Sequence, residues 1–195
     1  GEVIVVDNNS TDKSSEIAKN SGAKVVFCEQ IGYGNALRYG FKNANGKFII
    51  MGDGDDSYDF SEIPEFYLEI TTKNADMVTG TRLKGTIHKG AMPFLHRYLG
   101  TPVLTFILNL LYKTKISDSQ CGMRMFKRDC LDKIEFKTTG MEFASELFVQ
   151  FAKHNFSIKE IPIHLYPVHN RKSKLNPIRD GLRHLFYLIS ALHNT

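Results

Sequence analysis

The sequence is poor in cysteine, and its few cysteines form no framework. Cys28, Cys121 and Cys130 fall in no C-x-x-C spacing, and their odd number argues against a set of paired disulfides. This excludes a disulfide-stapled secreted domain. We therefore expect a protein of the reducing cytoplasm, free there or at the cytoplasmic face of a membrane.

A long hydrophobic run is also missing. The longest mostly apolar stretch, 98–112, is shorter than the ~20 residues that a membrane-spanning helix needs. The formal net charge is only +4, and the basic residues form no clustered stripe. We therefore expect no nucleic acid partner, whereas an anionic ligand or peripheral contact with a membrane surface fits this charge.

What is present indicates one folded domain over residues 1–195. Apolar residues make up 42% of the chain and charged residues 24%, as in an ordinary globular protein. A chain of this length is expected to form a single domain with a buried core. No internal repeat or linker divides it.

Short apolar strand patterns alternate with helical patterns along the chain. Strands are expected at 3–6, 25–28, 47–51, 76–80, 121–126 and 158–165. Helices are expected at 13–21 with Ile17 inward, 35–43, 63–74, 93–112 with a break at 100–102, 142–154 and from 177. Because parallel neighbours need crossover connections, the pattern predicts an α/β fold with a mainly parallel, Rossmann-like sheet flanked by helices.

Two of the loops that follow the early strands are acidic. Asp7 follows the first strand, and Asp53 and Asp55 flank a glycine after the third. Ligands of such sheets bind outside the carboxyl ends of the strands, so we expect the two loops to meet at one rim. Carboxylates suit Mg²⁺ or Mn²⁺, which take one or two of them together with ligand phosphates. Asp53 and Asp55 are thus predicted metal ligands for a nucleotide diphosphate.

Six short motifs follow one another along the chain. The first three are VVDNNSTD at 5–12, GYGNA at 32–36 and DGD at 53–55, and the later three are GTR at 80–82, DSQCGMR at 118–124 and RKSKL at 171–175. The first three resemble nucleotide-binding motifs of family 2 inverting glycosyltransferases with the A-type fold. The later three resemble the branch of dolichyl-phosphate mannose and glucose synthases and their polyprenyl-phosphate relatives. The resemblance implies transfer of a hexose, with inversion, from a UDP- or GDP-sugar to a polyprenyl or dolichyl phosphate.

The resemblance also implies roles for individual residues. In the nucleotide-binding half, residues 1–82, those assigned to the sugar nucleotide are Asp7, Asn8, Gly32, Gly34, Asn35, Asp53 and Arg82. In the acceptor-side half, residues 83–195, those assigned to the acceptor or its phosphate are Arg97, Arg124, Arg171 and Lys174. Asp55 takes part in catalysis through the metal that bridges the diphosphate. A divalent metal ion and arginine side chains can both neutralise the negative charge that develops on a departing diphosphate.

A carboxylate base is needed only for some acceptors. A phosphate is largely ionised at neutral pH and needs no base, whereas a hydroxyl does. Glu142 and Glu146 stand four residues apart at the start of a predicted helix, in the region where many relatives carry the base. Either can be the base or a favourable helix-start charge, and between the two we favour Glu146 as the catalytic residue.

Several alternatives remain open at this stage. Relatives begin with a further strand before the one expected at 3–6, so this first strand is expected to be missing here. The rival functions are transfer to a saccharide hydroxyl, nucleotidyl transfer with release of pyrophosphate, and a degenerate nucleotide-binding module. The apolar stripe at positions 104, 107, 108 and 111 either faces the core or lies on a membrane, and we favour the core.

Overall fold

The strands form two sheets in the part of the chain that the structure, a computed structural model, describes: residues 1–168 and 177–192. In the smaller sheet β1 (Ile4–Asp7) and β2 (Lys24–Phe27) pair in parallel. The larger sheet has the order β3-β5-β4-β6. Its strands are β3 (Phe48–Met51), β4 (Met77–Ile87), β5 (Arg124–Lys127) and β6 (Ile158–Leu165). The predicted α/β class is confirmed.

The larger sheet is mostly parallel, as predicted, with one antiparallel strand that the sequence did not predict. β4 and β6 are parallel, but β5 runs antiparallel to both of its neighbours, β3 and β4. The chain leaves β4 at its carboxyl end and comes back to that same end, where Asp118 accepts a hydrogen bond from the backbone N–H of Arg82. A strand that enters the sheet from the end at which its neighbour left must run in the opposite direction. The expected crossover is therefore absent between β4 and β5.

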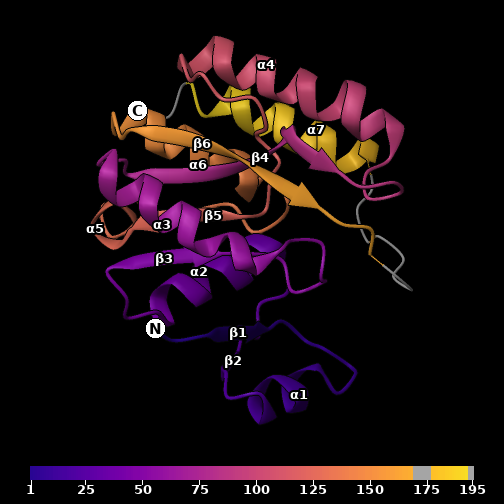
Figure 1. The fold of residues 1–195 in the computed structure, drawn as a ribbon. Coiled ribbons are helices and arrows are strands. Elements are labelled where there is room, and N and C mark those ends of the chain that lie inside the picture. The colour runs from indigo at the N-terminus through magenta and orange to yellow at the C-terminus, as the bar shows by residue number, and fades with distance from the viewer. Residues whose placement is uncertain (169–176, 193–195) are drawn as a thin grey trace.

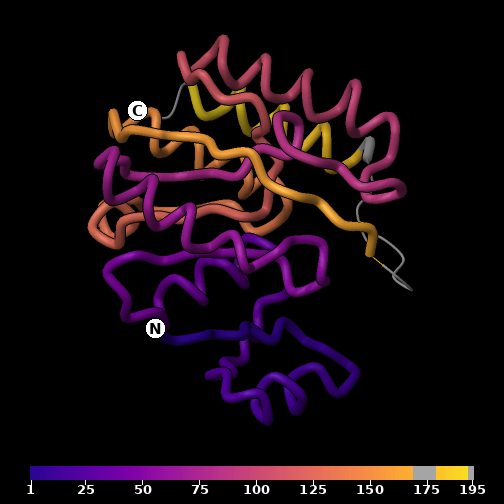
Figure 2. Tube along the Cα trace, in the orientation of Figure 1, coloured from indigo at the N-terminus to yellow at the C-terminus, as the bar shows by residue number. Residues whose placement is uncertain are grey.

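Helices lie on both sides of the larger sheet (Figures 1 and 2). They are α1 (Ser14–Asn20), α2 (Tyr33–Asn43), α3 (Ile63–Thr72), α4 (Thr101–Tyr112), α5 (Arg128–Leu131), α6 (Phe143–Lys153) and α7 (Pro177–Ser190). A 3₁₀ turn (Phe60–Glu62) precedes α3, and a π-helix, η2 (His96–Gly100), precedes α4. In Figure 1, α4 and α7 lie together at one end of the molecule, and β1, β2 and α1 lie at the other.

Two helix predictions need correction. The predicted break at 100–102 is not a break, because η2 runs directly into α4 and Pro102 stands in the first turn, where its missing N–H is tolerated. Ile17 is 63% exposed rather than turned inward. α1 buries none of its residues, because it packs only against the small β1–β2 sheet at the edge of the molecule.

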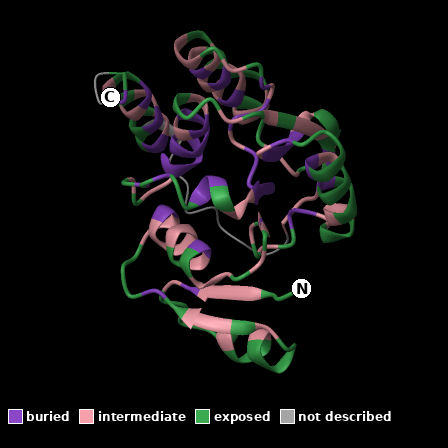
Figure 3. Ribbon diagram, turned by 90° about the vertical axis from the view of Figure 1, so that its left-hand side faces the viewer, coloured by how far each residue is buried: buried purple, intermediate pink, exposed green. Residues whose placement is uncertain are grey.

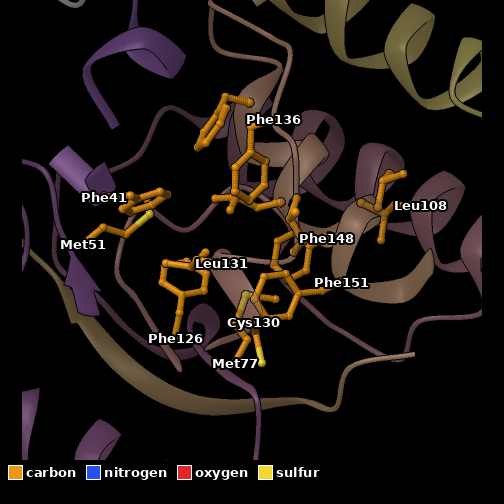
Figure 4. Close-up of a cluster of buried hydrophobic side chains, with 14 of the residues drawn as sticks. Phe41, Met51, Met77, Leu108, Phe126, Cys130, Leu131, Phe136, Phe148 and Phe151 are labelled. Atoms are coloured by element: carbon orange, nitrogen blue, oxygen red, sulfur yellow. The ribbon is translucent and has the colours of Figure 1, made fainter. Parts of the chain in front are cut away.

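The main core lies between the larger sheet and α6. Eight of the eleven residues of α6 are buried, which is expected of a helix that is apolar on most of its surface. Figure 4 shows the labelled members of this cluster: Phe41, Met51, Met77, Leu108, Phe126, Cys130, Leu131, Phe136, Phe148 and Phe151. Each fully buried phenylalanine contributes roughly 1.5–3 kcal/mol to folding.

A second core covers the opposite face of the same sheet, under α3. Successive residues of a strand point to opposite faces, so Phe126 belongs to the first cluster and Met125 to the second. Phe66 and Ile70 of α3 close this second cluster. Of the stripe at 104, 107, 108 and 111, Leu108 is fully buried in the first core, and Ile107 and Leu111 pack against it, as the core-facing interpretation predicts.

α7 is fastened to α6 by a buried polar contact. The hydroxyl of Ser145 and Nδ1 of His184 are 2.7 Å apart, and both residues are buried. Burial lowers the pKa of His184 to about 4 because the charged imidazolium is poorly solvated there. In the folded chain the imidazole of His184 is therefore neutral above about pH 4, and the α6–α7 contact is made by this neutral form.

This burial predicts a loss of stability in mild acid. The unfolded chain takes up a proton at His184 near pH 6.5, but the folded chain does so only near pH 4, so stability is complete above pH 6.5 and falls between these values. From pH 7.5 to 5 the wild type should lose about 2 kcal/mol more than His184→Asn in urea unfolding. His154→Asn, at an exposed position, should behave as wild type. Equal losses in all three proteins would contradict this prediction.

Candidate functional site

Asp7 and Asn8 shape the loop at the end of β1. The Asp7 carboxylate accepts hydrogen bonds from the Ser15 hydroxyl and from the Ser10 N–H at 2.8 Å, and these bonds lower its pKa. The Asn8 amide donates to the carbonyls of Cys28 and Gln30 at 3.0 and 2.9 Å. It also accepts from the Gly32 N–H at 2.8 Å. Asn8 therefore joins the end of β1 to the end of β2 and to the start of α2.

The glycines at the start of α2 are required by contact with the protein itself. Gly32 has φ +144°, and a Cβ there would collide with the carbonyl oxygen of Thr139. A Cβ at Gly34 would lie 2.6 Å from the carbonyl oxygen of Thr138, and the Gly34 N–H donates to Thr139 at 2.9 Å. Gly32 and Gly34 are thus in close contact with the backbone at 138–139, and their predicted contact with the sugar nucleotide remains a prediction. Asn35 donates to the carbonyl of Ile31 at 3.2 Å and so closes the same turn.

Tyr33 connects this turn to the acidic loop that follows β3. Desolvation and then the negative charge of Asp53 raise the pKa of the Tyr33 hydroxyl, which also shares a hydrogen bond with Asp53. On its other side Asp53 lies against Gly122, where an added Cβ would collide with Oδ2 of Asp53. The loops of Asp7 and Asp53 are therefore linked through a single turn, Gly32–Tyr33. Tyr33 and Gly122 were not among the predicted site residues, although both stand inside recognised motifs.

Asp55 lies in a loop that is fastened to β6. Its Oδ1 accepts from the Ser57 hydroxyl at 2.5 Å and from the Ser57 N–H at 3.2 Å. The Ser57 carbonyl accepts from the Tyr166 N–H at 2.9 Å, and Tyr58 bridges to Leu165. The chain thus leaves β6 beside the acidic loop. The predicted phosphate ligands Arg171 and Lys174 come next in the sequence and lie outside the described residues.

The acidic loop fits a divalent ion that arrives together with a phosphate ligand. Among residues 1–168 and 177–192, no group of three His, Cys, Asp or Glu side chains is placed to hold a metal ion by itself. Mg²⁺ and Mn²⁺ commonly use one or two carboxylates and complete their coordination with phosphate and water. Gly122 supports this fit, because a side chain at that position would occupy the space beside Oδ2 of Asp53. Asp53 and Asp55 are the residues that would hold such an ion.

Arg82 is held in a nearly buried ion pair next to this loop. Its Nε and Nη2 donate to the two oxygens of Asp118 at 2.7 and 2.8 Å, and the two side chains are 12% and 0% exposed. Burial opposes ionisation of both groups, yet their pairing raises the pKa of Arg82 and lowers that of Asp118. Arg82 is therefore charged and held in one orientation by Asp118, and the contact predicted between Arg82 and the sugar nucleotide remains a prediction.

Arg124 is a structural residue. It is fully buried, and it donates to the carbonyls of Ser119, Cys121 and Ala144, each at 2.9 Å. Its guanidinium also lies 4.3 Å from the ring centroid of Phe148. These contacts tie the segment before β5 to α6 and leave no surface for a ligand. We therefore remove Arg124 from the predicted phosphate site.

Glu146 is also engaged in the interior. It is 1% exposed and accepts from the N–H groups of Lys137 and Thr138 at 2.8 and 2.9 Å, and from the Thr138 hydroxyl at 2.5 Å. Glu146 therefore orders the 137–138 backbone, next to the carbonyls that contact Gly32 and Gly34. This geometry argues against the predicted role of Glu146 as a base.

Of the two glutamates, Glu142 is the better candidate for a catalytic base, because one of its carboxylate oxygens has no protein partner among the described residues. Its Oε1 accepts from the Gly140 N–H at 3.2 Å and from Arg183 at 2.9 Å. Its Oε2 is buried and has no hydrogen-bond partner in the described part of the chain. Buried carboxylate oxygens are normally satisfied, so this atom is a candidate for contact with a ligand. The sequence offered both glutamates, and only their burial and partners separate them.

Arg97 lies apart from the acidic loop. It belongs to η2, is partly exposed, and its guanidinium lies 5.4 Å from the ring centroid of Tyr98. The predicted contact of Arg97 with an acceptor phosphate remains a prediction.

Solved structures share this fold. Glucosyl-3-phosphoglycerate synthase from Mycobacterium tuberculosis, in complex with phosphoglyceric acid, superposes with a TM-score of 0.76 at 18% identity, covering 98% of this chain and 69% of that one. A complex of the same enzyme with Mn²⁺ and UDP-glucose gives a TM-score of 0.73 at 18% identity, covering 97% and 67%. The predicted A-type glycosyltransferase fold is confirmed.

The chain belongs to glycosyl transferase family 2. Residues 2–135 match the model of that family. The low-salt glycan biosynthesis hexosyltransferase Agl6 of Haloferax volcanii is 42% identical over 192 residues, 98% of this chain and 46% of its own length. The dolichyl-phosphate hexose transferase of Haloferax volcanii is 33% identical over 185 residues, 92% of this chain and 76% of its own length. The chain thus spans about half the length of Agl6.

No helix among the described residues is both long enough and apolar enough to cross a membrane.

The Gly32–Thr139 contact predicts a localised sensitivity to substitution. Gly32→Ala should lower the free energy of unfolding by about 3 kcal/mol, because it adds a steric clash to an unfavourable positive φ. Gly181→Ala is the matched control, since a Cβ there meets no atom within 4 Å and the position is helical. The control should be neutral or slightly stabilising in urea unfolding. If the two variants unfold alike, the turn is not anchored as described.

Proposed function

We propose that the chain is the catalytic domain of a metal-dependent glycosyltransferase that moves a hexose from a nucleoside-diphosphate sugar to a polyprenyl or dolichyl phosphate, with inversion. The observation that carries the proposal is the joining of two acidic loops, at Asp7 and Asp53, by the Gly32–Tyr33 turn. Two relatives support the hexosyl group, and the name of one also supports the dolichyl phosphate acceptor. Solved relatives of the same fold bind UDP-glucose and Mn²⁺, which favours a UDP-sugar, with a GDP-sugar as the alternative.

Each part of the site then has a chemical task. The turn ordered by Asp7 and Asn8 positions the nucleoside, and Asp53 and Asp55 hold the divalent ion. A bound Mg²⁺ or Mn²⁺ supplies positive charge at the diphosphate oxygens. Arg82, fixed by Asp118, adds a permanent positive charge next to the same loop.

Inversion follows from attack on the face opposite the leaving group. An oxygen of the acceptor phosphate forms the new bond to the anomeric carbon while the bond from that carbon to the diphosphate oxygen breaks. The nucleoside diphosphate leaves with the electron pair. Because the acceptor oxygen is already ionised, no proton has to be removed. Arg97, Arg171 and Lys174 are the proposed ligands of the acceptor phosphate.

The metal assignment is tested by calorimetry. UDP-glucose and GDP-mannose are titrated with and without Mn²⁺ into wild type, Asp55→Ala and Glu65→Ala. Mn²⁺ should strengthen binding of one donor to the wild type, and Asp55→Ala should weaken this metal-dependent binding by at least about tenfold. Glu65, an exposed carboxylate at the start of α3, is the matched control, and Glu65→Ala should leave metal-dependent donor binding unchanged. Retention of metal-dependent binding by Asp55→Ala would refute the site.

A second candidate function rests on Glu142. Its buried Oε2 without a partner is suited to accept a proton, and a base of this kind is required when the acceptor is a saccharide hydroxyl. This alternative keeps the donor site unchanged and differs only in the acceptor.

Glu142→Gln separates the two acceptor classes. Glutamine keeps an oxygen for Arg183 and Gly140 but does not act as a base. With polyprenyl phosphate and sugar acceptors offered side by side, lipid phosphate transfer should fall by less than about threefold, since no proton is removed in that reaction. A loss of about 10²-fold or more, confined to a hydroxyl acceptor, would instead establish the second function. Circular dichroism checks that the variant is folded.

A further inference from the structure

Two neighbouring helices expose a stripe of large apolar side chains. We name the α4–α7 face by its six members: Val103, Phe106, Leu110, Leu182, Phe186 and Ile189. Phe106 is 66% exposed and Phe186 is 76% exposed. Single exposed apolar residues are ordinary, but a contiguous group of this kind marks an interaction surface.

The stripes of the two helices face the same side. α4 buries Thr105 and Leu108, and α7 buries His184 and Leu188, so each helix turns its opposite stripe to solvent. Both helices pack on α6 and on each other, and the Tyr112 hydroxyl donates to the Leu188 carbonyl at 2.6 Å. Figures 1 and 3 show the two helices together as the outermost layer at this end of the molecule. Leu95, directly before η2, and Leu99 within η2 are also exposed.

The sequence around this face is depleted of acidic residues. No Asp or Glu occurs between Asp76 and Asp118, a stretch that contains six Lys and Arg residues. In α7 the single acid, Asp180, is buried and lies 3.4 Å from Arg179. Lys113, at the end of α4, is an exposed positive charge, and Arg183 of α7 is exposed but paired with Glu142 at 2.9 Å. In the described residues, η2, α4 and α7 carry no exposed acidic side chain.

We propose that the α4–α7 face binds the surface of an anionic lipid bilayer. Apolar side chains of an interfacial helix insert at the boundary of the acyl chains, and the cations beside them attract anionic headgroups. A second copy of the chain fits less well, because its positive border would oppose the same border on the first. The inference deepens the proposed function, since it names the surface that supplies a lipid acceptor. Bilayer binding does not require the sugar nucleotide, so its test can fail while the proposed transferase function stands.

Vesicle flotation tests the apolar part of the proposal. The chain is mixed, without nucleotide, with vesicles of phosphatidylcholine alone or with a third of phosphatidylglycerol. It should float with the anionic vesicles, and Phe106→Gln combined with Phe186→Gln should reduce the partition coefficient by at least about tenfold. Tyr67→Gln combined with Leu68→Gln is the control, because these large side chains are also exposed, at 53% and 61%, but lie on α3. Unchanged flotation of the first double variant would overturn the proposal.

The charge is tested with Lys113→Gln, at the exposed end of α4, which should weaken partitioning about fivefold at low salt. Equal binding to both vesicle types would overturn the requirement for anionic lipid.

Sedimentation at increasing protein concentration tests the other possible occupant of the face, a second copy of the chain. A dimer that Phe106→Gln and Phe186→Gln dissociate, in a chain that does not float, would assign the face to a second copy. Calorimetry with the donor, as above, shows separately whether the active site is intact.

Discussion

The structure depends on one backbone contact, between the glycine turn at the start of α2 and the segment at 138–139. In the described residues β1 and β2 pair only with each other, so no ladder hydrogen bonds join them to the larger sheet. What holds them is α2, which packs on β1 and reaches the main core through Phe41, together with the bonds of the Gly34 and Asn35 N–H groups to the Thr139 carbonyl. Because that carbonyl lies where a Cβ would be, only glycine at position 32 allows the two parts to meet. The position of the Asp7 loop relative to the Asp53 loop is fixed by this contact.

Charged residues of the recognised motifs divide into two groups with different physical roles. Arg124 and Asp118 are buried, and their side chains bond to backbone groups and to Arg82. Glu146, outside the motifs, is buried as well and accepts from the Lys137 and Thr138 N–H groups and the Thr138 hydroxyl. They hold the loops around β5 and α6 in one arrangement, at the cost of desolvating charge that their partners must offset. The carboxylates proposed to hold the metal ion, Asp53 and Asp55, lie in the loop after β3. A rigid frame of this kind is what preorganised stabilisation of a leaving diphosphate requires.

The sequence predicted the parts of the fold that follow from local patterns. The β-branched run before Asp7 and the apolar run before Asp53 became β1 and β3, because alternating strands and helices leave few arrangements. It did not predict the direction of β5, which depends on where a long excursion returns to the sheet. Nor did it separate Glu142 from Glu146, since both have the same chemistry and helix position, and only the backbone at 137–138 buries one of them. Arg124 was misjudged for the same reason, because a motif shows which residues occur together but not which side chains point inward.

α4 is apolar on two sides, one packed in the core and the other in the face proposed to bind a bilayer. Its sequence, TPVLTFILNLLY, has few polar residues to decide which stripe turns inward. Because α4 packs against α6 through the side that carries Leu108, Phe106 and Leu110 on the other side remain exposed to solvent. Figure 1 places this outer layer at the end of the molecule opposite β1 and β2, with the larger sheet and its acidic loop between them. In the proposed function, a donor held at the β1 end and an acceptor delivered from a lipid surface at the α4 end would therefore reach the acidic loop from opposite ends of the molecule.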